Sequence, residues 1–263
     1  MKPARFDYAA PASIDALLSL LSEYGPAATV LAGGQSLMPL LNRRRVRPEL
    51  LIDLNRVVGI EGISFGRGSL RIGAMTRQRE IEYSGVVAEH APLLAKAIKF
   101  VGNPATRNRG TLGGSIAFAE SSAELPACMV CLDANFHLAS ERGERRIPAV
   151  EFFYGRHRTA LAADEALLSI EILSSAGRPA EFLEISGRAQ DQAIVGVAAR
   201  MTRADDAIAI VFGVDERPIQ IAAPFLDGDW PIALPVSDEI AAKEDRRRLA
   251  HVLASRAFRA IAT

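Results

Sequence analysis

The chain has 263 residues, of which 49% are hydrophobic and 24% are charged. These proportions are ordinary for a globular protein and allow a substantial core, in one composite unit or in two to three small subdomains. Lysine plus arginine number 31 and aspartate plus glutamate also number 31, so the formal net charge is zero. This balance argues against nucleic-acid binding, which selects a basic face, and against a polybasic membrane-surface protein.

Two cysteines and four histidines are too few and too scattered for an iron–sulfur cluster or a structural zinc site, which need about four ligands. Any such centre is therefore expected in another chain. Cys128 and Cys131 are expected to pack in the core as small hydrophobic residues. The N-terminus does not resemble a signal peptide, and the longest apolar stretches, such as residues 207–214, are far short of a bilayer span. We therefore expect a cytoplasmic protein with no integral membrane span.

The first 54 residues follow a β/α order. Residues 13–25 predict a helix, with Ser13 as its N-cap and Gly25 at its C-terminal end. Short strands are predicted at residues 28–31 and 50–54. A glycine turn follows the first of these strands, and Ser36 is expected to cap a short helix after the turn.

The middle of the chain mixes strands with apolar helices. A strand is predicted at residues 69–75, after which Thr76 is expected to cap a helix. A longer helix is predicted around residues 86–101, and Gly102-Asn103-Pro104 ends it. Another helix is predicted to begin near Ser122 and to carry residues 126–132.

The last third contains short strand-like segments in succession, followed by a charged helix. This order is typical of an α+β domain with an antiparallel sheet, and the most linker-like stretch before it is residues 174–177. The segments are residues 182–186, 194–202, 207–214 and 219–222, a hairpin loop at 204–206, and the helix at 237–259.

Two glycine pairs, Gly33-Gly34 and Gly113-Gly114, each leave an apolar segment and precede a polar residue. Glycine lets a ligand approach the backbone, and successive amide N–H groups in a turn bind anions, more so next to a helix N-terminus. The Ser36 and Thr111 hydroxyls and the Gln35 amide could donate further hydrogen bonds. Two such turns facing each other would suit a pyrophosphate, whereas the alternative is a pair of ordinary tight turns. Neither a G-x-G-x-x-G fingerprint nor a Walker A motif is present.

Residues 32–41 (AGGQSLMPLL) and 107–117 (RNRGTLGGSIA) resemble the two FAD-binding loops of the medium subunit of carbon monoxide dehydrogenase and its molybdenum-hydroxylase relatives. The likeness runs in order along nearly the whole chain. It implies an FAD-binding domain of the vanillyl-alcohol-oxidase (PCMH) type at residues 1–175, in subdomains of about 1–54 and 55–175. It further implies a C-terminal α+β domain at residues 176–263, with a three-stranded antiparallel sheet and helices.

The resemblance implies no catalytic side chain and no metal ligand, because the flavin itself is the redox centre. It places Glu124 where the family has a carboxylate near the cofactor, and Leu167 against the flavin or adenine ring. The alternative for Glu124 is a capping box with Ser121. The implied FAD contacts are Ala32, Gly33, Gly34, Gln35, Ser36, Thr111, Leu112, Gly113, Gly114, Ser115, Glu124 and Leu167.

The same resemblance implies two partner chains, an iron–sulfur small subunit with two [2Fe-2S] clusters and a molybdenum large subunit with molybdopterin, in a heterotrimer or its dimer. Electrons would pass from the clusters through FAD to an external acceptor. Two departures keep an FAD-free assembly subunit open as an alternative. The family lysine before Arg188-x-x-Asp191 is missing, and Gln192 replaces an aromatic residue. A stand-alone flavin oxidoreductase is the other alternative.

Overall fold

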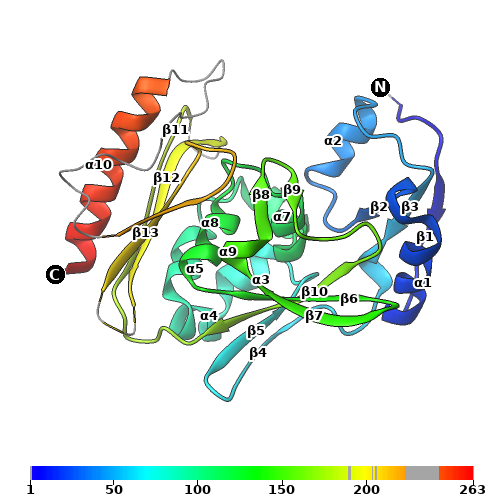
Figure 1. Ribbon diagram of the computed structural model, residues 1–263, viewed down its shortest axis with the longest axis horizontal. Coiled ribbons are helices and arrows are strands. Elements are labelled where there is room, and N and C mark those ends of the chain that lie inside the picture. The colour runs from blue at the N-terminus through cyan, green and yellow to red at the C-terminus, as the bar shows by residue number, and fades with distance from the viewer. Residues whose placement is uncertain (1, 189–190, 203, 205, 223–242, 263) are drawn as a thin grey trace.

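The computed structural model describes residues 2–188, 191–202, 204, 206–222 and 243–262. The chain passes through three blocks that lie in sequence order between the N-terminus and the C-terminal helix (Figure 1). Each block is built on one main sheet among the described residues, with three, five and four strands in turn. A small ladder of two strands accompanies the second sheet.

The first block holds a parallel sheet in the order β1-β3-β2. The predicted first helix is confirmed, since the Ser13 hydroxyl accepts a hydrogen bond from the Ala16 amide and Gly25 ends the helix with a φ of 47°. Apolar side chains of this helix pack on the sheet. The elements are β1 (Asp7–Ala9), α1 (Ile14–Tyr24), the 3₁₀ turn η1 (Gly25–Ala27), β2 (Ala28–Leu31), α2 (Leu37–Asn42), β3 (Leu50–Asp53) and the 3₁₀ turn η2 (Leu54–Arg56).

The second block holds an antiparallel sheet in the order β4-β5-β10-β6-β7, covered by short helices. Its core is the largest in the molecule's described part and is centred on α8, all of whose residues are buried. The elements are β4 (Ile63–Gly66), β5 (Ser69–Gly73), α3 (Gln78–Tyr83), α4 (Gly85–His90), α5 (Pro92–Ala97), α6 (Pro104–Arg109), α7 (Leu112–Phe118), α8 (Glu124–Cys131), β6 (Asn135–Ser140), β7 (Gly143–Pro148), α9 (Ala149–Phe152), β8 (Phe153–Gly155), β9 (Arg158–Thr159) and β10 (Ala166–Leu173).

Two predictions for this block are wrong. The Thr76 hydroxyl does not cap a helix but donates to the carbonyl of Gly62, and α3 begins two residues later with Arg77 at its N-cap. The predicted long helix at residues 86–101 is divided into α4 and α5. Pro92 has no N–H to continue α4 and starts α5 instead. Cys128 and Cys131 are fully buried in the core, as predicted.

The third block is an antiparallel sheet in the order β11-β12-β13-β14, with one long helix against one face (Figure 1). The predicted three-stranded sheet is wrong, because β14 pairs with β13 from Ile219 opposite Val211 onward. Ile221 of this fourth strand is buried in the core under the helix. The elements are β11 (Ala180–Ser186), β12 (Ala193–Met201), β13 (Ala207–Phe212), β14 (Ile219–Ala222) and α10 (Lys243–Ala262).

The two faces of this third sheet have different partners. One face contributes Phe182, Ala198 and Phe212 to the core of the second block, and the other packs on α10. The predicted helix at 237–259 is confirmed from residue 243 onward. Its first six residues, and residue 205 of the predicted hairpin loop, lie outside the described residues.

The predicted domain boundaries near residues 54 and 175 fall between the three sheets and stay predictions. In the part of the chain that the structure describes, no helix is both long and apolar enough to cross a lipid bilayer.

Candidate functional site

The loop of residues 32–36 joins β2 to α2 and needs both of its glycines. Gly34 has a φ of +75°, a conformation that L side chains rarely adopt. Gly33 faces the chain at the end of α6, where an added Cβ would collide with the Arg109 carbonyl and lie 2.8 Å from the α-carbon of Gly110. The loop from the first block therefore packs directly against the segment that leads into α7.

The amides of this first loop are available to a ligand. Among the described residues, no acceptor receives the N–H groups of Gly33, Gly34, Gln35 and Ser36. The Gln35 side-chain amide donates to the Gly33 carbonyl at 3.2 Å and so braces the loop. Ser36 does not cap α2 as predicted, because its backbone is already helical and its hydroxyl makes no capping bond. That hydroxyl is exposed at the loop.

The second glycine pair is not a turn, in contrast to our prediction. Gly113 and Gly114 lie in the first turn of α7, whose N-cap is Thr111. The amides here are already used. The N–H of Gly114 is bonded to the Thr111 hydroxyl oxygen at 3.1 Å, and that of Gly113 to the Ala74 carbonyl at 2.8 Å. This side therefore offers the hydrogen of the Thr111 hydroxyl and the positive end of a helix, rather than a row of free amides.

Gly113 is a glycine for packing reasons. An added Cβ would lie 2.5 Å from the Cβ of Ala74 and 2.8 Å from its carbonyl oxygen, so α7 could not approach the sheet so closely. The predicted contact Leu112 is fully buried in the core, and its N–H donates to the Thr76 carbonyl at 3.1 Å. Leu112 holds α7 in place and does not line the cavity described below.

A chain of hydrogen bonds, which we call the Asn55–Arg77 clip, joins the two loops from behind. The side-chain amide of Asn55 donates to the Ala32 carbonyl at 3.2 Å. Arg77 donates to the side-chain oxygen of Asn55 at 2.6 Å and to the Arg109 carbonyl at 2.5 Å. The clip therefore sets the spacing between the loop of the first block and the segment before α7.

Asp53 supports the clip at its outer end. Its carboxylate accepts hydrogen bonds from the backbone N–H of Asn55 at 2.9 Å and from the Tyr8 hydroxyl at 2.7 Å. Partial burial acts to raise the pKa of Asp53, but these hydrogen bonds outweigh it and leave the pKa below its ordinary value. Asp53 is therefore a carboxylate at neutral pH and orients Asn55.

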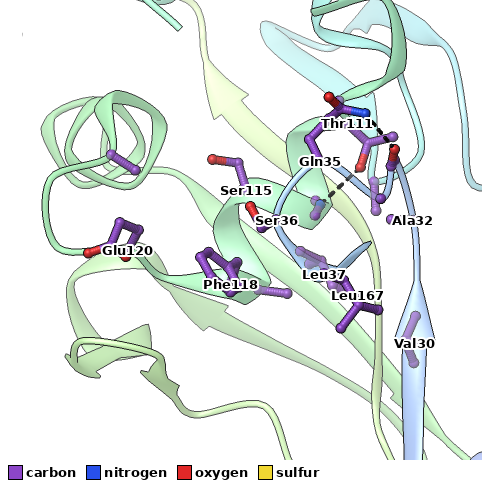
Figure 2. Close-up of a pocket in the computed structure, with 18 of the residues that line it drawn as sticks. Val30, Ala32, Gln35, Ser36, Leu37, Thr111, Ser115, Phe118, Glu120 and Leu167 are labelled. Atoms are coloured by element: carbon purple, nitrogen blue, oxygen red, sulfur yellow. Dashed lines mark hydrogen bonds between the residues drawn. The ribbon is translucent and has the colours of Figure 1, made fainter. Parts of the chain in front are cut away.

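Between the two loops lies a cavity of about 580 Å³, within the range of small-molecule and cofactor sites. Figure 2 shows the polar side chains of Gln35, Ser36, Thr111 and Ser115 at the loops, with Leu37, Leu167 and Val30 on the apolar side. All predicted contact residues except Leu112 line this cavity: Ala32, Gly33, Gly34, Gln35, Ser36, Thr111, Gly113, Gly114, Ser115, Glu124 and Leu167.

Glu124 lines the cavity from the first turn of α8 and is only 8% exposed. The predicted capping box is wrong, because the Ser121 hydroxyl donates to Glu120 and the N-cap position belongs to Ala123. Burial raises the pKa of Glu124 to about 7. Glu124 thus lines the cavity without the Ser121 capping box, and its contact with a cofactor stays a prediction.

Two glutamines of the cavity were missed as site residues by the sequence analysis. Gln78 is 4% exposed, and its side-chain oxygen has no hydrogen-bond partner among the described residues. Gln192 comes from the third block and donates to the Ser122 hydroxyl. Gln192 could have been found from the sequence, because it stands where the family has an aromatic residue. No sequence signal marks Gln78, because its burial arises only when α3 packs beside Gly110.

The ion pair of Glu165 and Arg145 stiffens the wall next to Leu167. Arg145 donates to both carboxylate oxygens of Glu165, at 2.6 and 2.8 Å, and the Ala162 amide adds a third hydrogen bond. The hydrogen bonds from Arg145 hold the pKa of Glu165 below its ordinary value despite its burial. This carboxylate is fully engaged, so it acts as part of the scaffold.

Free amides, hydroxyls and a helix N-terminus on one side, and a long apolar wall on the other, define a protein that binds a nucleotide-type cofactor carrying a diphosphate. The site therefore fits FAD. The side-chain oxygen of Gln78, which has no partner among the described residues, could accept a hydrogen bond from an N–H group of the cofactor. Residues 4–172 match the family model described as the FAD binding domain in molybdopterin dehydrogenase. The chain belongs to this family.

Relatives of the chain are subunits of dehydrogenase complexes. It is 39% identical over 203 residues to the 6-hydroxypseudooxynicotine dehydrogenase complex subunit alpha of Paenarthrobacter nicotinovorans, covering 77% of this chain and 69% of that one. It is 36% identical over 209 residues to the carbon monoxide dehydrogenase medium chain of Hydrogenophaga pseudoflava, covering 79% of this chain and 73% of that one.

The solved structure of carbon monoxide dehydrogenase from Hydrogenophaga pseudoflava matches the fold with a TM-score of 0.92 at 30% sequence identity, covering 99% of this chain and 98% of that one. The chain is thus an oxidoreductase component, an FAD-binding medium subunit of the molybdenum-hydroxylase class.

Proposed function

We propose that this chain binds FAD between its two loops and passes electrons from the iron–sulfur clusters of a partner subunit to an external acceptor. The observation that carries the proposal is the cavity itself, in which the free amides of residues 33–36 face the N-terminus of α7. The FAD contacts that we propose are the predicted residues lining this cavity.

The diphosphate of FAD would lie at the loops, where several hydrogen-bond donors line the cavity. The amides of Gly33 to Ser36 are free to donate to it, and the hydroxyls of Ser36, Thr111 and Ser115 lie on the same cavity wall. Hydrogen bonds from neutral donors to a charged acceptor are worth about 1.5–3 kcal/mol each, so a few of them decide where the cofactor is anchored.

We place the flavin ring toward the end of the cavity lined by Glu124 and Gln192, where the second block meets the third. Leu167 would pack against one of the aromatic rings of the cofactor. When bound, FAD supplies the change between one-electron and two-electron steps. The residues of this chain bind and orient it, and none is needed as a nucleophile.

The partners that we propose are an iron–sulfur small subunit with [2Fe-2S] clusters and a molybdenum large subunit with molybdopterin, in a heterotrimer or its dimer. The two cysteines of this chain are buried and free, which supports placing the clusters in another chain. We also propose the PCMH-type assignment of the FAD domain, the domain boundaries given above, and a cytoplasmic location, where free thiols persist.

The substrate of such a complex would be oxidised in the molybdenum subunit. The relatives are named for 6-hydroxypseudooxynicotine and for carbon monoxide. We therefore propose hydroxylation of an aromatic heterocycle or an aldehyde, or oxidation of carbon monoxide, without choosing among them from this chain.

FAD binding is tested by titrating the purified chain with FAD and following the flavin fluorescence. We expect saturable uptake of one FAD per chain, with the visible flavin bands retained after gel filtration. A chain that takes up no FAD would instead be the assembly subunit considered above. Rapid turnover of the isolated, loaded chain with a simple reductant would favour a stand-alone flavin oxidoreductase.

Electron transfer is tested on the complex. Co-purification of the tagged chain from its native host should bring iron and molybdenum in metal analysis. Reduction of that complex with limiting dithionite should bleach the iron–sulfur bands and the flavin bands together. A purified chain without associated iron or molybdenum would contradict the proposed partners.

A further inference from the structure

The turn of the β8–β9 hairpin lies against the C-terminal end of α7. The turn consists of Arg156 and His157. The backbone N–H of His157 donates to the Ala119 carbonyl at 2.9 Å. The ring nitrogen Nδ1 of His157 lies 2.9 Å from the carbonyl oxygen of Phe118. A carbonyl oxygen can only accept, so Nδ1 carries the proton of this hydrogen bond.

His157 therefore caps α7 from another segment of the chain. The last carbonyls of a helix have no partner within the helix. Helix α7 ends at Phe118, and Ala119 at its C-cap is left-handed with a φ of 48°. His157 supplies donors to the carbonyls of both residues. The rings of Phe118 and His157 are also in contact, with their centroids 4.4 Å apart. One residue of the hairpin thus fixes the end of this helix.

The capped end of α7 is part of the cavity wall. Phe118 and Glu120 both line the cavity (Figure 2). At the other end of the helix, Thr111 lines the same cavity beside the first loop. Helix α7 runs from Leu112 to Phe118, and at 1.5 Å per residue it follows the wall for about 10 Å. A displacement of its capped end would therefore change the shape of the cavity.

Glu120 brings a carboxylate to this wall, and the same turn compensates its charge. The Nε atom of Arg156 lies 2.8 Å from one carboxylate oxygen, and the Nε2 atom of His157 lies 3.4 Å from the other. The backbone N–H of Ser121 donates a further hydrogen bond at 3.1 Å. A carboxylate without these partners would repel an anionic cofactor. The turn therefore supports both the shape and the charge of the wall.

The backbone of His157 is strained, and the base of the hairpin is rigid. The φ of His157 is 58°, a value that residues other than glycine, asparagine and aspartate seldom adopt. Such a conformation persists where the surrounding structure determines it. At the base of the hairpin, Phe152 and Phe153 are buried, and the Ala160 N–H donates to the Phe152 carbonyl at 2.8 Å. The side chain of His157 is 43% exposed, so its removal should leave the hairpin in place.

We propose that His157 is a positioning residue that holds the Phe118–Glu120 wall around bound FAD and so limits the rate at which FAD leaves. The inference rests on the proposed function, since it needs FAD in this cavity. It does not depend on which end of the cavity holds the flavin ring. His157 lies outside the cavity lining and acts through Phe118 and Glu120.

The first test measures FAD dissociation from the loaded full chain, by rapid filtration at successive times after dilution. His157→Ala loses the Nδ1 hydrogen bond and the ring contact, so we expect dissociation about tenfold faster than in the wild type. Asparagine tolerates a positive φ and carries an N–H donor at the position of Nδ1. His157→Asn should therefore release FAD at close to the wild-type rate. The control Arg158→Ala changes an exposed residue of the same hairpin and should keep the wild-type rate.

An unchanged rate in His157→Ala would overturn the inference, as would equally fast release from His157→Asn. A further variant separates the cap from general stability. His157→Gly relieves the backbone strain but has no side-chain donor, so it should melt at a higher temperature than His157→Ala and yet release FAD as fast. Slower release from His157→Gly than from His157→Ala would show that FAD retention follows stability, contrary to the inference.

A second measurement needs only the wild type. The N–H of His157 is hydrogen-bonded, so its exchange with deuterium requires the turn to open. If FAD leaves when the turn opens, bound FAD should slow this exchange by mass action. Unchanged exchange in the peptide that contains His157 would overturn the inference. Failure of the wild type to take up FAD would contradict the proposed function and this inference with it, whereas the other outcomes contradict the inference alone.

Discussion

Arg77 donates a hydrogen bond to the side-chain oxygen of Asn55 at 2.6 Å, and this contact connects the two loops of the FAD cavity. Asn55 follows the first sheet and Arg77 precedes the first helix of the second block, so the bond crosses between blocks. Through it, the Ala32 and Arg109 carbonyls are held by one network. The loops therefore do not adjust independently of each other.

Loss of this clip should weaken FAD binding more than folding. In Arg77→Ala, two hydrogen bonds from a charged donor disappear at a partly exposed site, so we expect about 1.4 kcal/mol of lost binding, or about tenfold in the dissociation constant. Flavin fluorescence titration measures this. Arg79→Ala is the matched control, since Arg79 is exposed on the same helix and lies over the ring of Tyr83. Equal affinities in the two variants would refute the role of the clip.

The role of Gly34 in FAD binding can be distinguished from the role of a glycine that only forms a turn. Alanine at a φ of +75° costs roughly 1 kcal/mol, and its Cβ would lie 3.2 Å from the Met38 side chain, which would have to shift. We expect Gly34→Ala to lower both the melting temperature and the FAD affinity. Gly68 has a φ of +79° with no atom near an added Cβ. Gly68→Ala should therefore lower the melting temperature alone, and a similar loss of FAD affinity there would argue against our loop assignment.

The stability of the FAD-free chain should fall as pH rises from about 5 to above 8. The pKa values of Glu124 and Glu184, about 7 and about 8, lie above the ordinary value of 4.5. In this window the folded chain binds more protons than the unfolded chain, so the stabilisation is complete at low pH and is lost as pH rises through the folded pKa values. Allowing for solvent screening at the less buried Glu184, we expect a loss of about 2 kcal/mol.

Urea unfolding at several pH values measures this dependence. Glu184→Gln should flatten it, whereas Glu181→Gln should leave it in place, because Glu181 is paired with Lys96 at the edge of the sheet. The same steep dependence in Glu184→Gln would show that other groups cause it.

The two cysteines should be unreactive in the folded chain. Burial raises the pKa of Cys131 to about 12 and that of Cys128 well above its ordinary value, and both side chains are inaccessible. We expect no alkylation by iodoacetamide at pH 8 in the native chain and labelling of both cysteines in urea, followed by mass spectrometry. Rapid labelling of the native chain would indicate that α8 opens to solvent.

Local signals were sufficient to predict several elements. Ser13 and Gly25 bound α1 as expected, and the apolar run at residues 28–31 is β2. Thr76 and Ser121 looked like caps for the same local reason, but Thr76 bonds to Gly62 and Ser121 to Glu120. A hydroxyl chooses among partners that tertiary structure brings near, and that choice is not visible in a window of sequence.

The third sheet shows where resemblance was the weaker guide. The residues themselves indicated four strand-like segments, including residues 219–222, whereas the family likeness implied three strands. The structure pairs all four. Both loops of the cavity could be predicted from the two glycine motifs. Gln78 could not, and neither could the burial of the Glu184 carboxyl, because both depend on which polar groups become buried when helices and sheets pack.

The close approach of Gly33 to Gly110 has a consequence for how the molecule assembles. Neither segment alone makes a binding surface, so the cavity exists only after residues 1–54 have docked onto the rest of the chain. By mass action, a ligand that binds only the docked form also stabilises docking. Flavin supply would then govern the lifetime of this polypeptide, and an N-terminal protease cleavage that slows as FAD is added would be its signature.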